Sequence, residues 1–286
     1  MSFNFLAFIL LFCGLLVLWV PRAKQSWPYF ALGAIVIGFW QNLLGIYGLI
    51  ATVTFVGLCL ALRYKHPKTP KYILWIFHGG LILLSLALAL HLIPGFQPLI
   101  LYENIHFSEA SSAYTIRYHF DKAIAGFLLI ALLTDHITEI HTWKKTLKAL
   151  LPFLLVSIGV LTLLGLALDE LTFDPKLSQL ILWWALGNLL ITCIAEEAFF
   201  RLLIQQKLQS IFSNHYYGAQ ITIGLCALLF GLAHMAGGWV MMLGATVAGL
   251  IYAYIYHRTG RVEASILLHF SFNLAHILLF TYPRAI

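Results

Sequence analysis

The sequence predicts an all-α protein built as a polytopic bundle of transmembrane helices. Of its 286 residues, 61% are hydrophobic and only 10% are charged, and its mean hydropathy is +0.90, which lies far outside the range of ordinary soluble domains. Its apolar segments are continuous and about twenty residues long, which is the length that a helix needs to cross a bilayer. Transmembrane β-strands would instead alternate in polarity over about ten residues.

About ten spans are expected along the chain. The first, at residues 2–20, lacks the small-residue cleavage pattern of a signal peptide, so we expect it to remain as an anchor. Residues 27–64 are too long for one helix and predict a tight helical hairpin that turns near Gln41 and Gly45. The other expected spans are residues 72–92, 121–137, 150–168, 179–212, 217–235, 240–256 and 262–282.

One segment interrupts this pattern. Residues 93–121 contain prolines, glutamates and a serine-rich turn, which predict an exposed or interfacial loop, and residues 114–120 alternate in polarity like a short strand. No internal repeat or linker divides the chain. We therefore expect one integrated domain, with N-terminal helices in residues 1–178 and a C-terminal transmembrane core in residues 179–286.

The charged loops predict the orientation of the chain. Basic residues gather near Arg22, in residues 63–71 and in residues 144–148, whereas residues 169–174 form an acidic loop. The positive-inside rule then places the basic loops in the cytoplasm, and the acidic loop and both termini outside. This distribution also accounts for the basic pI of about 9.1, so nucleic-acid binding is rejected. The four cysteines lie in apolar segments at no metal-ligand spacing and predict core residues.

Three formal charges lie inside the expected span at residues 179–212: Glu196, Glu197 and Arg201. A charge near the bilayer centre costs roughly 2.5 to 3.5 kcal/mol, so such groups usually mark a functional site. Glu197 and Arg201 stand at i,i+4 on a helix and are expected to pair. Glu196 points about 100° away from Glu197, so it is expected to be the free carboxylate. A buried structural cluster of all three is the alternative.

Further polar groups interrupt later spans. His234 ends the next helix, and His269 and Asn273 stand at i,i+4 on one face of the last one. A carboxylate and an imidazole can together remove a proton from water, while a second histidine and an asparagine can donate hydrogen bonds to a tetrahedral oxyanion. The pattern favours peptide hydrolysis within the membrane. Ser271 faces away from His269 and Asn273 on a helix, so a covalent nucleophile is less favoured.

Three motifs carry a family resemblance: Glu-Glu-x-x-x-Arg at residues 196–201, Phe-x-x-x-His at 230–234 and His-x-x-x-Asn at 269–273. In order and spacing they resemble the CPBP (Abi) intramembrane proteases, which include the CAAX-processing endopeptidases, over roughly residues 179–279. The resemblance implies a glutamate-dependent endopeptidase with a four-helix catalytic core. The roles it implies are water activation by Glu196 and His234, an oxyanion hole of His269 and Asn273, and support from Glu197 and Arg201.

Several alternatives stay open. Zinc held by Glu196, His234 and His269 would use the same residues, whereas the main expectation is that no cofactor is needed. A proton-coupled transporter would more often show paired repeats or broken helices, and a non-catalytic membrane scaffold could share the fold. The expected partners are the lipid bilayer and a membrane protein or peptide substrate. The expected location is a bacterial inner membrane, and oligomeric state, substrate and any prenyl dependence stay undetermined.

Overall fold

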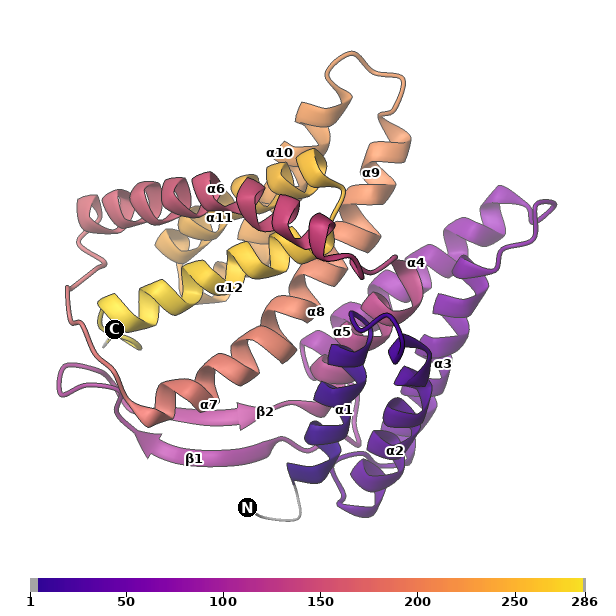
Figure 1. The fold of residues 1–286 in the computed structure, drawn as a ribbon, viewed down its shortest axis with the longest axis horizontal. Helices are drawn as coiled ribbons and strands as arrows, with labels where there is room; N and C mark the ends of the chain where they lie inside the picture. Colours follow the sequence, from indigo (N-terminus) through magenta and orange to yellow (C-terminus); the bar gives the residue numbers. More distant parts are fainter. Residues whose placement is uncertain (1–4, 285–286) are drawn as a thin grey trace. The chain divides into compact units, whose positions relative to one another are not determined.

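The computed structural model describes residues 5–284, so residues 2–4 of the first expected span lie outside the described residues. Figure 1 shows mainly helices. The helices are α1 Leu6–Val17, α2 Trp27–Trp40, α3 Ile46–Arg63, α4 Lys71–Ala89, α5 Phe120–Leu133, α6 Ile140–Ala167, the helical segment Gln179–Ile211 (α7 to α9), α10 Gly218–Ala233, α11 Trp239–Thr259 and α12 Val262–Leu279. Strands β1 Leu99–Ile105 and β2 Tyr114–Tyr118 pair in a two-stranded sheet.

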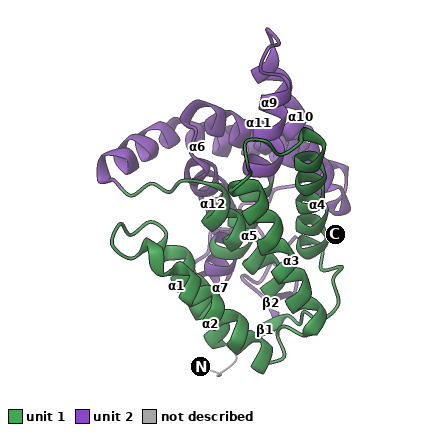
Figure 2. Cartoon of the chain, turned by 90° about the vertical axis from the view of Figure 1, so that its right-hand side faces the viewer, with its two compact units in different colours: residues 1–101, 117–138, 190–199 green, residues 102–116, 139–189, 200–286 purple. Residues whose placement is uncertain are grey.

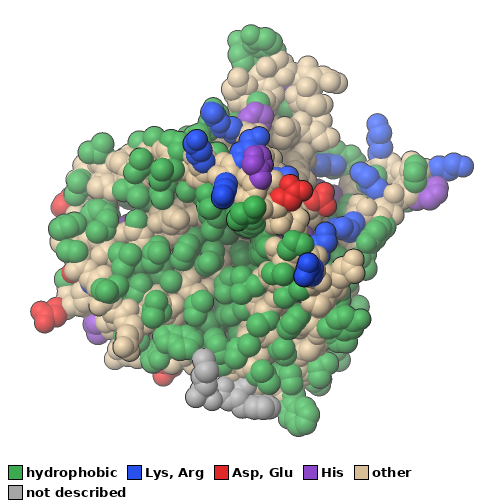
Figure 3. Space-filling model, viewed as in Figure 1, with side chains coloured by type: hydrophobic (Ala, Val, Ile, Leu, Met, Phe, Trp, Pro, Cys, Tyr) green, Lys and Arg blue, Asp and Glu red, His purple; other side chains and the backbone are tan. Residues whose placement is uncertain are grey.

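Within the described residues, six helices are long and apolar enough to cross a membrane. They are α3, α4, α6, the segment Gln179–Ile211, α11 and α12. Their outward side chains are largely apolar, as expected for surfaces that face lipid, and Figure 3 shows hydrophobic side chains over much of one face. These features confirm a helical integral membrane protein.

The expected number of ten spans is not confirmed. A helix coincides with each expected span, but α1 has 12 residues, α2 and α5 have 14 each, and α10 has 16. At 1.5 Å per residue, a 14-residue helix reaches only about 21 Å, less than the roughly 30 Å of a hydrocarbon core. The apolar content of the sequence predicted these helices but did not show at which residues they end.

The two helices and the turn predicted in residues 27–64 are confirmed, but the tight hairpin is not, because α2 packs mainly against α1, whereas α3 packs against α4 and α5. α2 ends at Trp40 and α3 begins at Ile46. The turn is fixed by Gly95, whose carbonyl accepts a 2.5 Å hydrogen bond from the Gly45 N–H. Gly95 has a φ of 91°, and a Cβ at this position would lie 3.1 Å from the Gly48 nitrogen. Only glycine meets both demands without strain.

Two expectations for the connecting segments were wrong. The segment expected as a loop at residues 93–121 contains strand β1 as well as β2, and its Ile116 and Tyr118 are buried. The basic residues of 144–148 lie within α6, which begins at Ile140 and continues through Pro152. Their side chains are exposed on the first turns of the helix, because a long amphipathic side chain can extend its charge towards water from a helix.

The chain divides into two compact units, each made of discontinuous segments (Figure 2). Unit 1 comprises residues 1–101, 117–138 and 190–199. Its central helix is α5, which is buried on almost every side and packs against α1 to α4 and against α8, Ile194–Glu197. A helix that is apolar all round is typical of such a central position.

Unit 2 comprises residues 102–116, 139–189 and 200–286. Its central helix is α11, which packs against α6, α10 and α12. Small residues allow α10 and α11 to approach closely, since a Cβ on Gly249 would lie 3.2 Å from the Cα of Ala227. Such contacts are a common means of helix association in membranes, where no hydrophobic effect drives helices together.

Candidate functional site

The helical segment that carries the glutamates begins at Ser178, whose side chain accepts a hydrogen bond from the Leu180 N–H. It runs to Ile211, close to the predicted 179–212. Two π-helical stretches, Asn188–Cys193 and Ala198–Gln205, flank the glutamates. Such stretches are rare in proteins overall, and those that occur often lie at functional sites. They also change the angular spacing after Glu197, so the predicted i,i+4 pairing with Arg201 no longer follows from α-helical geometry and stays a prediction.

The two glutamates lie in unit 1 and have different surroundings. The Glu197 side chain is fully buried, whereas 20% of the Glu196 side chain is exposed. This difference agrees with the predicted divergence of the two side chains. The sequence had assigned no partner to Glu196, but its Oε1 lies 2.8 Å from the Nζ of Lys122 on α5. Glu196 is therefore ion-paired, and Lys122 is a site residue that sequence reasoning missed.

A glycine contact sets the position of this ion pair. Gly126 stands four residues after Lys122 and therefore on the same face of α5. A Cβ on Gly126 would lie 2.7 Å from the Cα of Ala195, the residue before Glu196. The backbones of α5 and α8 are thus almost in contact at this point. The absence of a side chain on Gly126 allows the Lys122 ammonium to reach the Glu196 carboxylate.

Arg201 lies in unit 2 and is fully buried. Its Nη1 donates a hydrogen bond of 2.8 Å to the Oε1 of Gln205, which is also fully buried. The Nε2 of Gln205 in turn donates 2.8 Å to the carbonyl of Ala253 on α11. This chain of hydrogen bonds attaches the second π-helical stretch to α11.

His234 caps the C-terminal end of α10, as expected from its place in the sequence. Its Nδ1 lies 2.8 Å from the carbonyl oxygen of Phe230. A carbonyl can only accept, so Nδ1 carries a proton, and Nε2 is the nitrogen that exchanges protons with another group. The hydrogen bond thus fixes both the ring orientation and the tautomer of a neutral His234.

Phe230 brings two motif histidines together within unit 2. Its ring centroid lies 4.6 Å from that of His234 and 5.8 Å from that of His269. His269 is only 5% exposed and stacks on Tyr252 of α11, with ring centroids 4.8 Å apart. The phenylalanine four residues before His234 therefore has a packing role, because its ring lies against both imidazoles.

Asn273 lies one turn after His269 on α12. Its Nδ2 donates a 3.3 Å hydrogen bond to the Oδ1 of Asn188, the first residue of the first π-helical stretch. Asn188 therefore orients the amide predicted for the oxyanion hole. Sequence reasoning missed this partner, because 85 residues separate the two asparagines in the chain.

The fold and these groups define an integral membrane protein that carries ionisable side chains within its helices. Residues 178–275 match the family model described as Type II CAAX prenyl endopeptidase Rce1-like. The chain thus carries a domain of the CAAX protease family over these residues, and the match confirms the resemblance drawn from the three motifs. No curated protein and no solved structure matches the chain. The matched segment contains Glu196, Glu197, Arg201, His234, His269 and Asn273.

Proposed function

We propose that the protein is an intramembrane endopeptidase that hydrolyses a peptide bond of a membrane-associated or lipid-anchored substrate. The observation that carries this proposal is the family match, whose 98 residues (178 to 275) include every residue of the three motifs. The contacts made by these residues support it. Each proposed catalytic side chain has a partner that orients it: Lys122 for Glu196, Phe230 for His234, Tyr252 for His269 and Asn188 for Asn273.

In the proposed mechanism, Glu196 and His234 remove a proton from one water molecule. The water oxygen then attacks the carbonyl carbon of the scissile peptide, and the negative charge moves to the carbonyl oxygen. His269 and Asn273 donate hydrogen bonds to this oxyanion. Collapse of the tetrahedral intermediate breaks the C–N bond, and the amine leaves with the proton taken from water. No serine, cysteine or covalent intermediate is required.

Lys122 is proposed as a positioning residue for this reaction. A general base must be ionised, and an ammonium 2.8 Å from Glu196 favours the carboxylate in a region of low dielectric. We expect Lys122→Ala to lower kcat/KM by about tenfold or more, which corresponds to about 1.4 kcal/mol. Lys122→Arg keeps the positive charge and should restore most of the rate. An unchanged rate in Lys122→Ala, or no rescue by Lys122→Arg, would exclude this role.

The oxyanion hole is tested by Asn273→Ala. A donor that acts mainly in the transition state is typically worth about 10²- to 10³-fold in kcat and has little effect on substrate binding. We therefore expect a large fall in kcat with a nearly constant KM. Asn188→Ala should have a smaller effect of the same kind, because Asn188 only orients Asn273. A rise in KM at constant kcat would assign Asn273 to substrate binding.

The runner-up mechanism uses zinc held by Glu196, His234 and His269. Two imidazoles and a carboxylate are suitable ligands for zinc. However, a metal on Glu196 would have to compete with the Lys122 ammonium for the same carboxylate. We therefore propose a metal-independent reaction and expect activity to survive extended treatment with a membrane-permeant chelator. Recovery of a chelated, inactive enzyme by added zinc alone would favour the metal mechanism.

We also propose that the shorter helices α1, α2, α5 and α10 complete the ten-span arrangement, in a bacterial inner membrane, with residues 179–286 as the catalytic core. In this topology the loop at Lys68 is cytoplasmic and Leu177 is outside. Leu177 is 92% exposed, so Leu177→Cys should react in intact cells with a membrane-impermeant thiol reagent. Lys68→Cys should react only after lysis, and the unsubstituted protein sets the background. The reverse pattern would overturn the orientation.

A further inference from the structure

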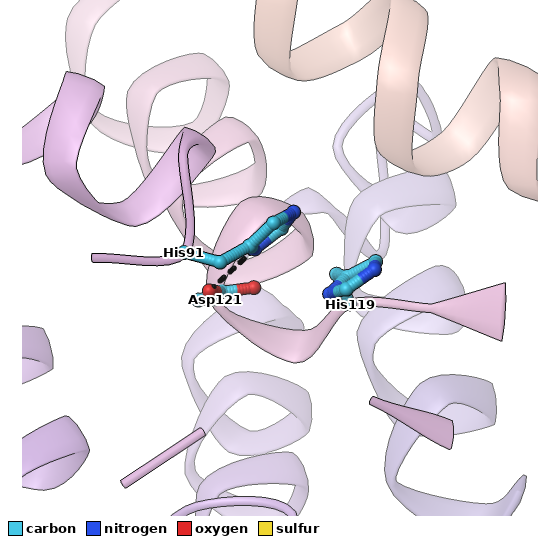
Figure 4. A group of neighbouring side chains, drawn as sticks. All are labelled: His91, His119 and Asp121. Atoms are coloured by element: carbon cyan, nitrogen blue, oxygen red, sulfur yellow. Dashed lines mark hydrogen bonds and ion pairs between the residues drawn. The ribbon is translucent and has the colours of Figure 1, made fainter. Parts of the chain in front are cut away.

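A second group of chemically active side chains lies outside the three motifs. It consists of His91, just after the end of α4, His119, which precedes α5, and Asp121 in the first turn of α5 (Figure 4). All three belong to unit 1. One ligand atom from each residue lies within 4.8 Å of the other two. Two segments separated by 28 residues in sequence thus bring two imidazoles and a carboxylate together.

Asp121 is the fixed member of this group. Its side chain is only 2% exposed. Its Oδ1 accepts a 2.8 Å hydrogen bond from the Lys122 N–H, and its Oδ2 accepts one of 2.8 Å from the Nδ1 of His91. A buried carboxylate is costly unless it is paired or binds a cation. Its orientation by a backbone N–H resembles the outer hydrogen bonds that orient carboxylate ligands in metal sites.

His91 is the most exposed member of the group. Its side chain is 39% exposed, and its ring stacks on that of His119 with centroids 3.8 Å apart and planes at 21°. Its backbone has a φ of 58°, which few residues other than glycine adopt without cost. This conformation ends α4 in a Schellman motif, in which the Leu92 N–H donates to the Ala87 carbonyl and the His91 N–H donates to the Leu88 carbonyl. Here the left-handed backbone turns the imidazole back towards Asp121.

This donor set is that of a transition-metal site. Two imidazole nitrogens and one carboxylate oxygen suit zinc, with the fourth tetrahedral position left for water. Bonds of about 2.0 to 2.1 Å place the ligand atoms of a tetrahedral zinc site roughly 3.3 Å apart. The three ligand atoms now lie within 4.8 Å of one another. They therefore have to approach one another by up to about 1.5 Å to bind zinc. Rotation of the exposed His91 ring, out of the stack with His119, provides this movement.

We propose that His91, His119 and Asp121 bind one divalent transition-metal ion of the zinc class. The ion replaces the hydrogen bond between His91 and Asp121 and joins the end of α4 to the start of α5. The site shares no residue with the three motifs. It is also independent of the proposed peptidase activity, because its predicted effect is on metal binding and stability.

The test uses the full-length protein in detergent, purified with a tag that contains no histidine and freed of metal by a chelator. Added Co²⁺ should bind at one equivalent with the visible absorption of tetrahedral cobalt, and Zn²⁺ should displace it. Zn²⁺ should also raise the thermal unfolding temperature. His119→Ala should weaken binding beyond the roughly 10- to 100-fold that loss of an outer-shell contact costs.

Two further variants keep the test decisive. His91→Asn also removes a ligand, and asparagine tolerates the left-handed backbone, so this variant should fold and still lose the metal. His215→Ala changes an exposed histidine in the turn before α10 and should bind like the unchanged protein. Absence of binding, or equal binding by the unchanged protein and His91→Asn, would overturn the proposal. Loss of binding in His234→Ala, with full binding in His91→Asn, would assign the metal to the motif residues.

Discussion

Glu196→Gln is expected to abolish proteolysis while the protein remains folded. The amide cannot accept the proton of the attacking water, and loss of general base catalysis typically costs about 10²- to 10⁴-fold. The amide oxygen can still accept a hydrogen bond from Lys122, so the contact between α5 and α8 is retained. The measurement is kcat/KM on a membrane peptide substrate, together with the thermal unfolding temperature in detergent.

The matched control is Glu103→Gln, which removes an exposed carboxylate from β1. It should retain full activity. His234→Ala should reproduce the loss expected for Glu196→Gln, because in the proposed mechanism the two residues activate the same water. If Glu196→Gln keeps more than about a tenth of the activity, Glu196 is not the general base.

Arg201→Ala is expected to cause the largest loss of stability. The guanidinium is fully buried and holds Gln205, which reaches the Ala253 carbonyl on α11. Removing the arginine leaves the buried Gln205 oxygen without this donor, and an unsatisfied buried polar group typically costs about 1 to 3 kcal/mol. The amount of folded protein after extraction and the unfolding temperature should both fall sharply.

Glu196→Gln serves as the matched comparison for this stability prediction. It changes a partly exposed carboxylate, whereas Arg201→Ala changes a fully buried cation. Their effects should therefore separate, with activity lost in the first and folded protein lost in the second. If both variants lost the same thermal stability, the assignment of Glu196 to catalysis and Arg201 to support would be wrong.

The sequence predicted the presence of the helices better than the residues at which they begin and end. The apolar runs and the turn near Gly45 were enough to place helices α2 and α3, because continuous hydrophobicity and turn residues are local signals, but they did not show that α2 packs against α1 and α3 against α4. The lengths of α1, α2 and α5 were not predictable from the same signals, since apolar content does not show at which residue a turn ends a helix. Strand β1 was missed because its residues Leu99–Ile105 do not alternate cleanly between polar and apolar. Its pairing with β2 is visible only in the folded structure.

The candidate site was predictable where charge conflicts with the membrane. Glu196, His234 and Asn273 interrupt apolar helices. The free-energy cost of placing such polar groups in a membrane makes them stand out in the sequence. Lys122 and Asn188 were not predictable, since each finds its partner across more than seventy residues of chain. The two π-helical stretches beside Glu196 have no sequence signature that distinguishes them from an α-helix.

The most direct test of the central claim is a comparison of peptide termini in membranes from cells that express the unchanged protein or Glu196→Gln at equal abundance. The substrate need not be known in advance. We predict new termini, within or beside membrane-anchored segments, that occur only with the unchanged protein. Identical sets of termini in the two membranes would contradict a peptidase that depends on Glu196.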